Sequence, residues 1–349
     1  MTERIRNLDE AERWAGEILP SVSRTFALSI RFLPGTLGRA VTTAYLLCRI
    51  ADTIEDDGGL TPARKGELFD AFLRGLDDAA AADAFTVDAT RDVRGDAAHV
   101  ALVRHTDAVC LLLRSLPKRT RAHVVKWVIE MVTGMHAFVD RYPTGIRIQT
   151  LEECREYCYY VAGTVGCMLT DLWREHAPGV GDREYAELWE RCEKFGEALQ
   201  TVNILKDIAW DAEHENAIYI PARTLAAHGS GHDTLLDAAH LEGNKAAVAD
   251  FIALAWQDLD TALEYLYRVP RRAIAVRAFC VLPLLYAYAT LRALTASRAM
   301  LHRGGSVKIS RGEVRALMVA GLGVMWSNNL LRRLVARVRT GPFEPLGAG

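Results

Sequence analysis

The chain has 349 residues, half of them hydrophobic, and its 42 basic and 44 acidic residues give a net charge of −2 at pH 7. This length allows one large core or two small ones, and the near-neutral charge excludes a general affinity for nucleic acid. The seven cysteines are odd in number and lack C-x-x-C spacing, which indicates buried, reduced thiols in a cytoplasmic protein. The charged N-terminus shows no apolar stretch typical of a signal peptide.

The first predicted elements are an amphipathic helix over residues 8–19, ended by Pro20, and a helical segment over residues 21–32. Ser23 and Arg24 lie near the start of the second segment, where a hydroxyl and a cation can contact a phosphate group. The alternative is an ordinary helix N-cap with an arginine on the surface.

The next predicted helix covers residues 35–56 and ends in the acidic run LLCRIADTIEDD. Asp52 and Asp56 are four residues apart, so on a helix both carboxylates leave the same face, with Cβ atoms roughly 6 Å apart. Arg49 lies one turn earlier on that face. Such oxygen ligands suit Mg²⁺, which usually takes one or two carboxylates plus substrate phosphate oxygens. Taken alone, the run is also compatible with the solvated acidic end of a helix.

The middle of the chain alternates between irregular and strongly periodic segments. Residues 77–96, rich in Ala, Asp, Arg and Gly, are predicted to form a surface loop. The helical period returns over residues 100–116 and 119–139, and the second of these is apolar nearly all round, as expected of a central helix.

A further helix is predicted over residues 150–173, in the run TLEECREYCYYVAGTVGCMLTDLW. It contains Tyr157 and two interior glycines, Gly163 and Gly166. Glycine inside a helix costs about 1 kcal/mol relative to alanine, so both positions indicate the close approach of a neighbouring helix or a ligand.

A second acidic motif occurs in the run GEALQTVNILKDIAWD, where Asp207 and Asp211 repeat the four-residue spacing. Gln200 and Asn203 precede them on the same predicted helix face. Amides and carboxylates inside an otherwise apolar helix are costly to bury unless something charged binds there. Two such helices facing each other would offer four carboxylates to Mg²⁺ ions, and a ligand that needs this much positive charge is a diphosphate.

Over residues 15–315 the chain resembles the squalene/phytoene synthase family, the head-to-head trans-prenyltransferases. The segments that carry this resemblance, in order, are Ser23–Phe26, CRIADTIED, YCYYVAGTVG, ALQTVNILKDIAWD and Tyr219–Pro221. The later FCVLP and SVKISRGEVRALM segments resemble squalene synthases more than phytoene synthases. The two aspartate motifs alone would equally indicate chain-elongating prenyltransferases or terpene cyclases.

The resemblance implies an all-α fold, the single-domain helical bundle of isoprenoid synthases around a central cavity, over residues 1–349, with residues 316–349 as a C-terminal helix and tail. It also implies a Mg²⁺-dependent condensation of two farnesyl diphosphates through presqualene diphosphate to squalene or a related C30 product. Squalene synthases complete this reaction with hydride from NADPH.

The resemblance assigns roles to individual residues. Asp52, Asp56, Asp207 and Asp211 would be metal ligands, Ser23, Arg24 and Arg49 would contact diphosphate, Gln200 and Asn203 would line the site, and Tyr157 would assist proton removal or stabilise cations. For Tyr157 the alternative is a buried structural role. Phe26 and Tyr45 could face carbocations through their ring quadrupoles, or simply pack in the core.

The sequence departs from the family pattern at three places that bear on the condensation and the reduction. The segment AEHENAIYIP is one residue longer than common forms and has Ala217 where an arginine is expected, and Trp210 stands between the two aspartates. Lys308 and Arg311 lie in the segment that resembles the nicotinamide-phosphate region, but Ser310 occupies a position that is often basic. NADPH binding and a solvated basic loop are therefore alternative interpretations of this segment.

The apolar run at residues 316–326 is about half as long as the roughly 20 residues needed to span a bilayer. Arginines flank it, so a basic amphipathic helix in peripheral contact with a membrane surface is one interpretation. The alternatives for function are a phytoene-type condensation of two geranylgeranyl diphosphates and, in a different class, a non-catalytic helical partner protein. A phosphohydrolase of the HD type would need histidine ligands that the chain does not offer.

Overall fold

The computed structural model describes residues 5–343, apart from the side chain of Arg24. Helices dominate this part of the chain, and the β-type pairing among these residues is a single isolated bridge between Arg147 and Ile218. The predicted all-α class is therefore confirmed. The chain divides into two compact units, residues 1–144 and 145–349, and each is described here by itself. The single domain expected from the sequence stays a prediction.

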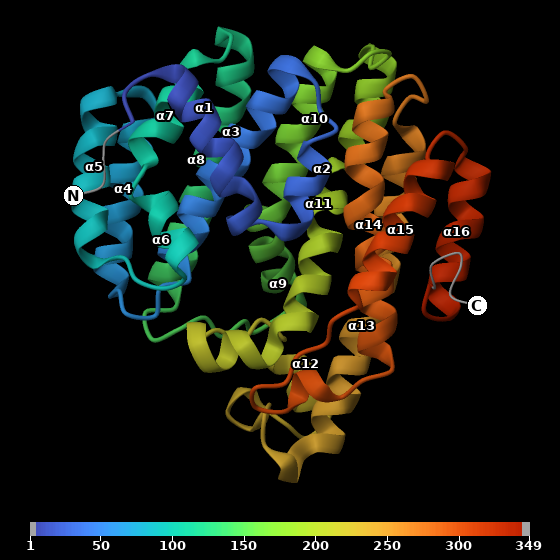
Figure 1. The fold of residues 1–349 in the computed structure, drawn as a ribbon. Coiled ribbons are helices and arrows are strands. Elements are labelled where there is room, and N and C mark those ends of the chain that lie inside the picture. The colour runs from blue at the N-terminus through green and yellow to red at the C-terminus, as the bar shows by residue number, and fades with distance from the viewer. Residues whose placement is uncertain (1–4, 344–349) are drawn as a thin grey trace. The chain divides into compact units, whose positions relative to one another are not determined.

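The N-terminal unit is organised around α3, which contacts helices on several sides (Figure 1). Its Leu46, Leu47, Ile50 and Ile54 are completely buried. The helices of this unit are α1 (Leu8–Val22), α2 (Arg24–Ile30), α3 (Gly35–Glu55), α4 (Pro62–Asp77), α5 (Ala79–Asp92), α6 (Ala97–Val103), α7 (Thr106–Ser115) and α8 (Lys118–Arg141).

Three sequence predictions fail in this unit. Pro20 does not end the first helix, because α1 continues to Val22 with an exposed proline inside it. The loop predicted over residues 77–96 is mostly the helix α5. Asp78 caps that helix by accepting two backbone N–H groups, and its many alanines are the strongest helix formers. The helix predicted over residues 100–116 is interrupted between α6 and α7.

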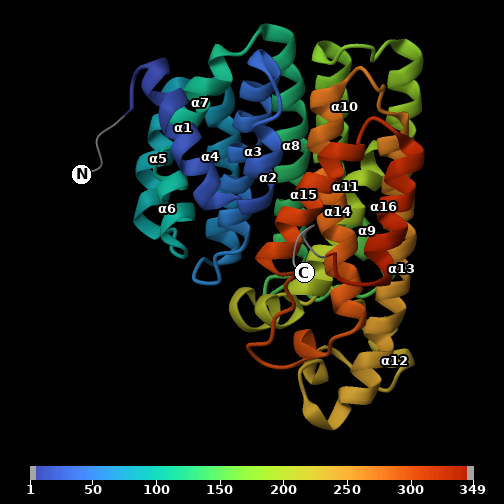
Figure 2. The same cartoon turned by 45° about the vertical axis from the view of Figure 1, so that its right-hand side comes forward.

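The C-terminal unit is organised around the 29-residue helix α11, which contacts α10, α13 and α14 (Figures 1 and 2). The longer elements of this unit are α9 (Leu151–Cys158), the π-helical turn η1 (Tyr159–Gly163), α10 (Thr164–His176), α11 (Asp182–Trp210), the π-helical turn η2 (Asp211–Glu215), α12 (Ala222–Ala227), α13 (Leu241–Arg268), α14 (Ile274–Thr295), α15 (Arg311–Val324) and α16 (Asn328–Thr340). Three short 3₁₀ turns cover residues 232–234, 238–240 and 299–301.

Glycines bring α11 into close contact with the segment before and within α10. A Cβ atom placed on Gly166 would lie 2.0 Å from the carbonyl oxygen of Cys192, and one on Gly196 would lie 2.0 Å from that of Ala162. No side chain fits at either position. The approach of a neighbouring helix predicted from the interior glycines of this segment is thus confirmed.

The π-helical turn η2 follows α11 directly and contains the second aspartate of the second acidic motif. Each π turn takes up one residue more than an α-helical turn, and such turns are frequent at functional sites. Asn216 ends η2 in the left-handed region, with φ of 53°. A π turn at this place is compatible with the prediction that the segment AEHENAIYIP is one residue longer than the common family forms.

Helix α14 is the one helix of the described chain that is long and apolar enough to cross a membrane. However, 83% of its most apolar window is buried inside the protein. This burial is what a core helix of a bundle shows, and length and composition alone are weak evidence for a membrane span.

Candidate functional site

The acidic motif on α3 includes its own cation. An Nη atom of Arg49 lies 3.4 Å from a carboxylate oxygen of Asp52, and the other Nη donates to the Tyr45 hydroxyl at 3.4 Å. Tyr45 in turn donates to the carbonyl of Val22 at 3.2 Å, which connects α3 to the end of α1. The guanidinium is therefore held in place before any ligand binds.

Burial sets the electrostatics of this motif. Burial raises the pKa of Asp52, and the neighbouring Arg49 only partly opposes that shift. Burial disfavours the charged form of Arg49, but Asp52 and Tyr45 more than compensate, so the pKa of Arg49 is raised. The Nε of Arg49 is buried and has no hydrogen-bond partner among the described residues. Asp56 is the C-cap of α3 and is partly exposed.

The residues predicted near α2 show mixed outcomes. The Ser23 hydroxyl accepts the Phe26 backbone N–H at 3.1 Å, so Ser23 caps α2, as the N-cap alternative requires. The ring centroids of Phe26 and Tyr45 lie 5.9 Å apart, which places an aromatic pair beside Arg49. The side chain of Arg24 lies outside the described part of the chain.

The acidic motif on α11 forms a polar row along one face of the helix. Asn203 donates to Gln200 at 3.5 Å, and Lys206 donates to Asn203 at 3.4 Å. The ammonium of Lys206 also lies 3.0 Å from a carboxylate oxygen of Asp207. Sequence reasoning overlooked Lys206. The sequence did contain a signal for Lys206, because this lysine lies within the acidic motif, directly before Asp207.

Asp211, the second aspartate of this motif, is more buried than Asp207. It is 8% exposed, and burial, followed by the like charges of Glu215 and Asp207, raises its pKa to about 9. Lys206 opposes this shift only in part. A carboxylate with this pKa lacks a compensating cation, which a bound metal ion would supply.

The donor set of the two motifs fits Mg²⁺. Within residues 5–343, no group of three or more His, Cys, Asp or Glu side chains is arranged to hold a metal ion. Each motif instead offers a pair of aspartates on one helix. Mg²⁺ usually accepts such a small number of carboxylates because substrate oxygens and waters complete its shell. One pair belongs to the N-terminal unit and the other to the C-terminal unit.

Tyr157 on α9 forms a buried pair with Tyr219. Its hydroxyl donates to the Tyr219 hydroxyl at 3.0 Å, and the ring centroids lie 4.6 Å apart at an interplanar angle of 26°. The two side chains are 3% and 7% exposed. The structure thus brings together tyrosines from two segments that the sequence singled out separately.

The structure shows where the departures from the family pattern within and after the second motif lie. Trp210 is 55% exposed and stacks on His214 with centroids 3.9 Å apart, so its ring points outward from the unit. Ala217 is buried. Beside it, Arg147 donates at 2.6 Å to both the backbone and the side-chain oxygen of Asn216. Arg147 is distant in sequence, and no motif identified it.

The basic segment near α15 has a simpler arrangement. Ser310 caps α15, because its hydroxyl accepts the Glu313 backbone N–H at 3.0 Å. This explains a serine at a position where the family pattern is often basic. Lys308 and Arg311 are exposed and have neither a hydrogen bond nor an ion pair with other residues in the described part of the chain.

Comparison with known proteins gives consistent matches. The family model for squalene/phytoene synthase matches residues 19–313. The squalene synthase of Bos taurus is 27% identical over 304 residues, which cover 86% of this chain and 67% of that protein. The squalene synthase of Schizosaccharomyces pombe is 27% identical over 309 residues, covering 88% of this chain and 64% of that protein.

Solved structures show the same similarity. A complex of TcSQS with the ligand BPH1237 has a TM-score of 0.81 at 25% identity, covering 95% of this chain and 92% of that one. A dehydrosqualene synthase in complex with a ligand has a TM-score of 0.58 at 18% identity, covering 95% of this chain and 96% of that one. The second likeness concerns the fold alone.

Proposed function

Since this chain belongs to the squalene/phytoene synthase family and is a squalene synthase-like prenyltransferase, we propose that it condenses two farnesyl diphosphates head to head. The reaction would proceed with Mg²⁺ through presqualene diphosphate to squalene or a related C30 product. The observation that carries this proposal is the pair of aspartate motifs, each on a helix and each at four-residue spacing.

Binding of the diphosphate is proposed to depend on both motifs. Asp52, Asp56, Asp207 and Asp211 would hold Mg²⁺, which neutralises diphosphate charge and stabilises the departing group. Arg49 is held by Tyr45 and Asp52, and its unpaired buried Nε remains free to donate to a diphosphate oxygen. Ser23 and Arg24 would contribute further contacts, with the Ser23 hydroxyl hydrogen free because its oxygen acts as the acceptor in the cap.

Polar and aromatic side chains would then handle the reacting hydrocarbon. Gln200 and Asn203 would line the diphosphate end of the site. Tyr157, whose hydroxyl donates to Tyr219, would assist proton removal or stabilise a nearby cation. Phe26 and Tyr45 would offer ring faces to carbocations, an attraction of roughly 0.5–2 kcal/mol per contact.

NADPH is proposed as the reductant, with Lys308 and Arg311 as ligands of its phosphate. Both side chains are exposed and neither has an ion partner among the described residues, so both charges are available to an anion. A solvated basic segment is the alternative, and only reduction of the product distinguishes the two.

Peripheral membrane contact on the cytoplasmic side is proposed for α15 and the start of α16. Val319, Trp326 and Leu330 are 66%, 48% and 43% exposed, and the exposed arginines Arg315 and Arg333 lie nearby in the sequence. Apolar and basic side chains together favour an anionic lipid surface. A membrane in contact with these helices would take up a reaction product that is insoluble in water.

The direct experiment incubates the purified protein with farnesyl diphosphate and Mg²⁺, with and without NADPH, and identifies extracted and phosphatase-treated products by mass. Squalene that forms only with NADPH supports the full proposal. Presqualene diphosphate, hydroxysqualene or dehydrosqualene regardless of NADPH supports the condensation and removes the reductase step. Product from geranylgeranyl diphosphate alone would overturn the C30 assignment in favour of phytoene-type condensation.

A further inference from the structure

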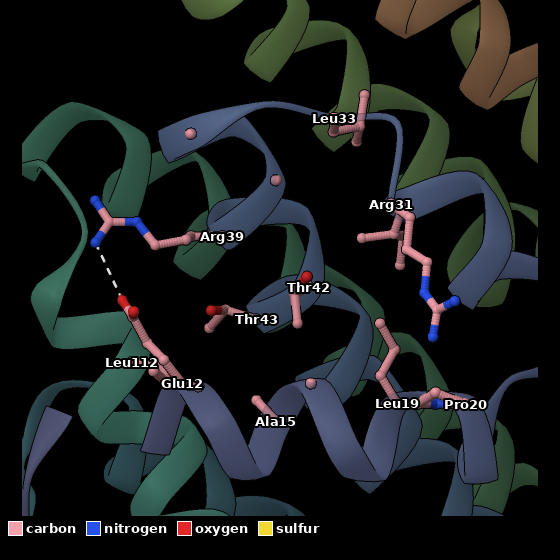
Figure 3. A pocket seen from close by; sticks show the side chains of 14 residues that line it. Glu12, Ala15, Leu19, Pro20, Arg31, Leu33, Arg39, Thr42, Thr43 and Leu112 are labelled. Carbon is pink, nitrogen blue, oxygen red and sulfur yellow. Dashed lines mark hydrogen bonds and ion pairs between the residues drawn. The ribbon is translucent and has the colours of Figure 1, made fainter. Parts of the chain in front are cut away.

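A cavity separate from every residue assigned to the reaction lies in the N-terminal unit. It has a volume of about 370 Å³ and is bounded by α1, the segment joining α2 to α3, and α3 itself (Figure 3). Its walls are mainly apolar, with side chains from Ala15, Leu19, Ile30, Leu33 and Leu112. This volume is near the lower end of the range for ligand sites, which is roughly 300–1,000 Å³.

The charges around this cavity leave one positive charge unbalanced. Figure 3 shows Arg39 and Arg31 at opposite ends. Arg39 lies 3.1 Å from Glu12, so those two charges compensate each other. Arg31 is exposed, and its guanidinium makes no ion pair or hydrogen bond with other residues within the described chain. A ligand that matches this arrangement has a single negative charge at one end.

Hydroxyl groups lie between the two ends. Thr42 and Thr43 line the cavity from α3, between the arginines in Figure 3. Thr43 is 1% exposed, yet its hydroxyl makes no hydrogen bond with another residue that the structure describes. The Thr43 hydroxyl can therefore donate to a polar ligand group or a water in the cavity.

The helix α1 supplies an independent observation. It contains Gly16 and Pro20, which both line the cavity and which both disfavour the interior of a helix. A Cβ atom on Gly16 would meet nothing within 4 Å, so packing does not require a glycine there. Pro20 has no N–H to donate to the carbonyl four residues earlier, that of Gly16. The two residues keep space open and leave a backbone acceptor at the cavity.

We propose that this cavity binds a single-chain amphiphile with a monoanionic head, such as an alkyl carboxylate or alkyl phosphate. The head would pair with Arg31, the Thr43 hydroxyl would donate to a head-group oxygen, the Gly16 carbonyl would accept from a bridging water, and the chain would lie on the apolar walls. At about 30 Å³ per water-sized group, the volume accommodates roughly a dozen groups.

The test measures binding to the full-length protein by calorimetry, below the micellar concentration of each probe. Dodecanoate, dodecyl phosphate and neutral dodecanol are compared. The wild type should bind both anions saturably, and Arg31→Gln should weaken the anions at least tenfold while it changes dodecanol less than twofold. The tighter of the two anions identifies the head group. Arg13→Gln, at an exposed arginine of α1 outside the cavity, should change nothing.

A second variant keeps the test decisive. Gly16→Leu should fill the cavity and abolish saturable binding of all three probes, and it should fold normally because leucine is a better helix former than glycine. Absence of saturable binding in the wild type would overturn the proposal. Binding that survives in both Arg31→Gln and Gly16→Leu would overturn it too, since it would place the probes elsewhere, including the prenyl-diphosphate site.

Discussion

The two aspartate motifs have the same spacing and opposite surroundings. On α3, Asp52 is paired with Arg49, a cation of the same helix that Tyr45 also holds. On α11, the lysine contacts Asp207, whereas Asp211 is buried among like charges and its pKa is raised to about 9. One motif is balanced by a cation of the protein, whereas the other contains a buried carboxyl that keeps its proton at neutral pH because its neighbours do not stabilise the negative charge.

This difference indicates a division of labour. A balanced motif is stable without a ligand and can present its arginine to a diphosphate at once. A buried carboxyl that keeps its proton becomes a metal ligand only when a divalent cation displaces that proton. Spacing alone therefore does not define what a DxxxD motif does, because the neighbouring charges decide which partner it requires.

The largest expected effect comes from neutralising either motif. Asp52→Asn and Asp207→Asn should each lower kcat/KM by about 10²–10³-fold or more, since each removes charge that the transition state requires. Steady-state assays with farnesyl diphosphate and Mg²⁺ measure this loss.

Asp57→Asn is the matched control in the same acidic run, because that carboxylate accepts backbone N–H groups of Gly59 and Arg94. It should lose stability and keep activity; full activity in both of the first two variants would remove the metal assignment.

Packing provides the next contrast. Gly196 on α11 has no room for a Cβ atom, so Gly196→Ala should reduce the free energy of unfolding by about 3 kcal/mol. Gly16→Ala on α1 should increase it by roughly 0.5–1 kcal/mol, because only the cost of a helical glycine is removed. Chemical denaturation of both variants measures the difference. Equal effects would show that α11 can move away from its neighbour.

Helix α11 also carries a buried carboxylate one turn before Gln200. Glu197 is 2% exposed, and its carboxylate lies 2.7 Å from Lys194 and 3.6 Å from Arg155. Burial nevertheless raises the pKa of Glu197 from 4.5 to about 7. Between these values the unfolded chain has lost this proton and the folded chain retains it, so Glu197 lowers stability as pH rises.

Glu197→Gln should reveal this dependence. As pH increases from about 4.5 to 7, the free energy of unfolding of the wild type should fall relative to the variant by up to about 3 kcal/mol, and above pH 7 the difference should level off. Urea denaturation at several pH values measures it. A difference that does not change with pH would show that Lys194 and Arg155 keep the carboxylate ionised throughout.

The smallest effect is expected at Lys206. Its ammonium competes with Mg²⁺ for Asp207, but it is 33% exposed, so the ion pair contributes less than about 1 kcal/mol. Lys206→Met should therefore lower the Mg²⁺ concentration at half-maximal activity by less than about fivefold. Lys245→Met removes a similar pair with Glu242 on α13 and should leave Mg²⁺ dependence unchanged. An increased Mg²⁺ requirement in Lys206→Met would contradict competition.

Periodicity and spacing predicted α3, α8 and the C-terminal half of α11, while the all-α class was implied by the family resemblance. These helices have strong apolar patterns, and their burial follows from those patterns. The same rules fail at residues 77–96, where aspartate and glycine favour a loop but alanine propensity and the Asp78 cap favour α5. Counting residue types in this segment does not include the stabilisation that the Asp78 N-cap gives to the helix.

The candidate site was predictable only where its chemistry is local. Asp52 and Arg49 are one turn apart, so their contact follows from the helix itself. The Tyr157–Tyr219 pair and the contacts of Arg147 with Asn216 join segments more than 60 residues apart. Tertiary packing creates such contacts, and neither residue type nor spacing encodes them.

Arg277 on α14 makes part of its hydrogen bonds with residues that follow Val324, and this limits how far the chain can be shortened. This arginine is 1% exposed, and its guanidinium donates to the carbonyls of Leu266, Val269 and Met325 and to the side chain of Asn328. Removal of the chain after Val324 would leave a charged group in the core with two of its acceptors missing, which costs several kcal/mol. Residues 325–340 thus contribute to the stability of the C-terminal unit, and truncation after Val324 should lower its free energy of unfolding.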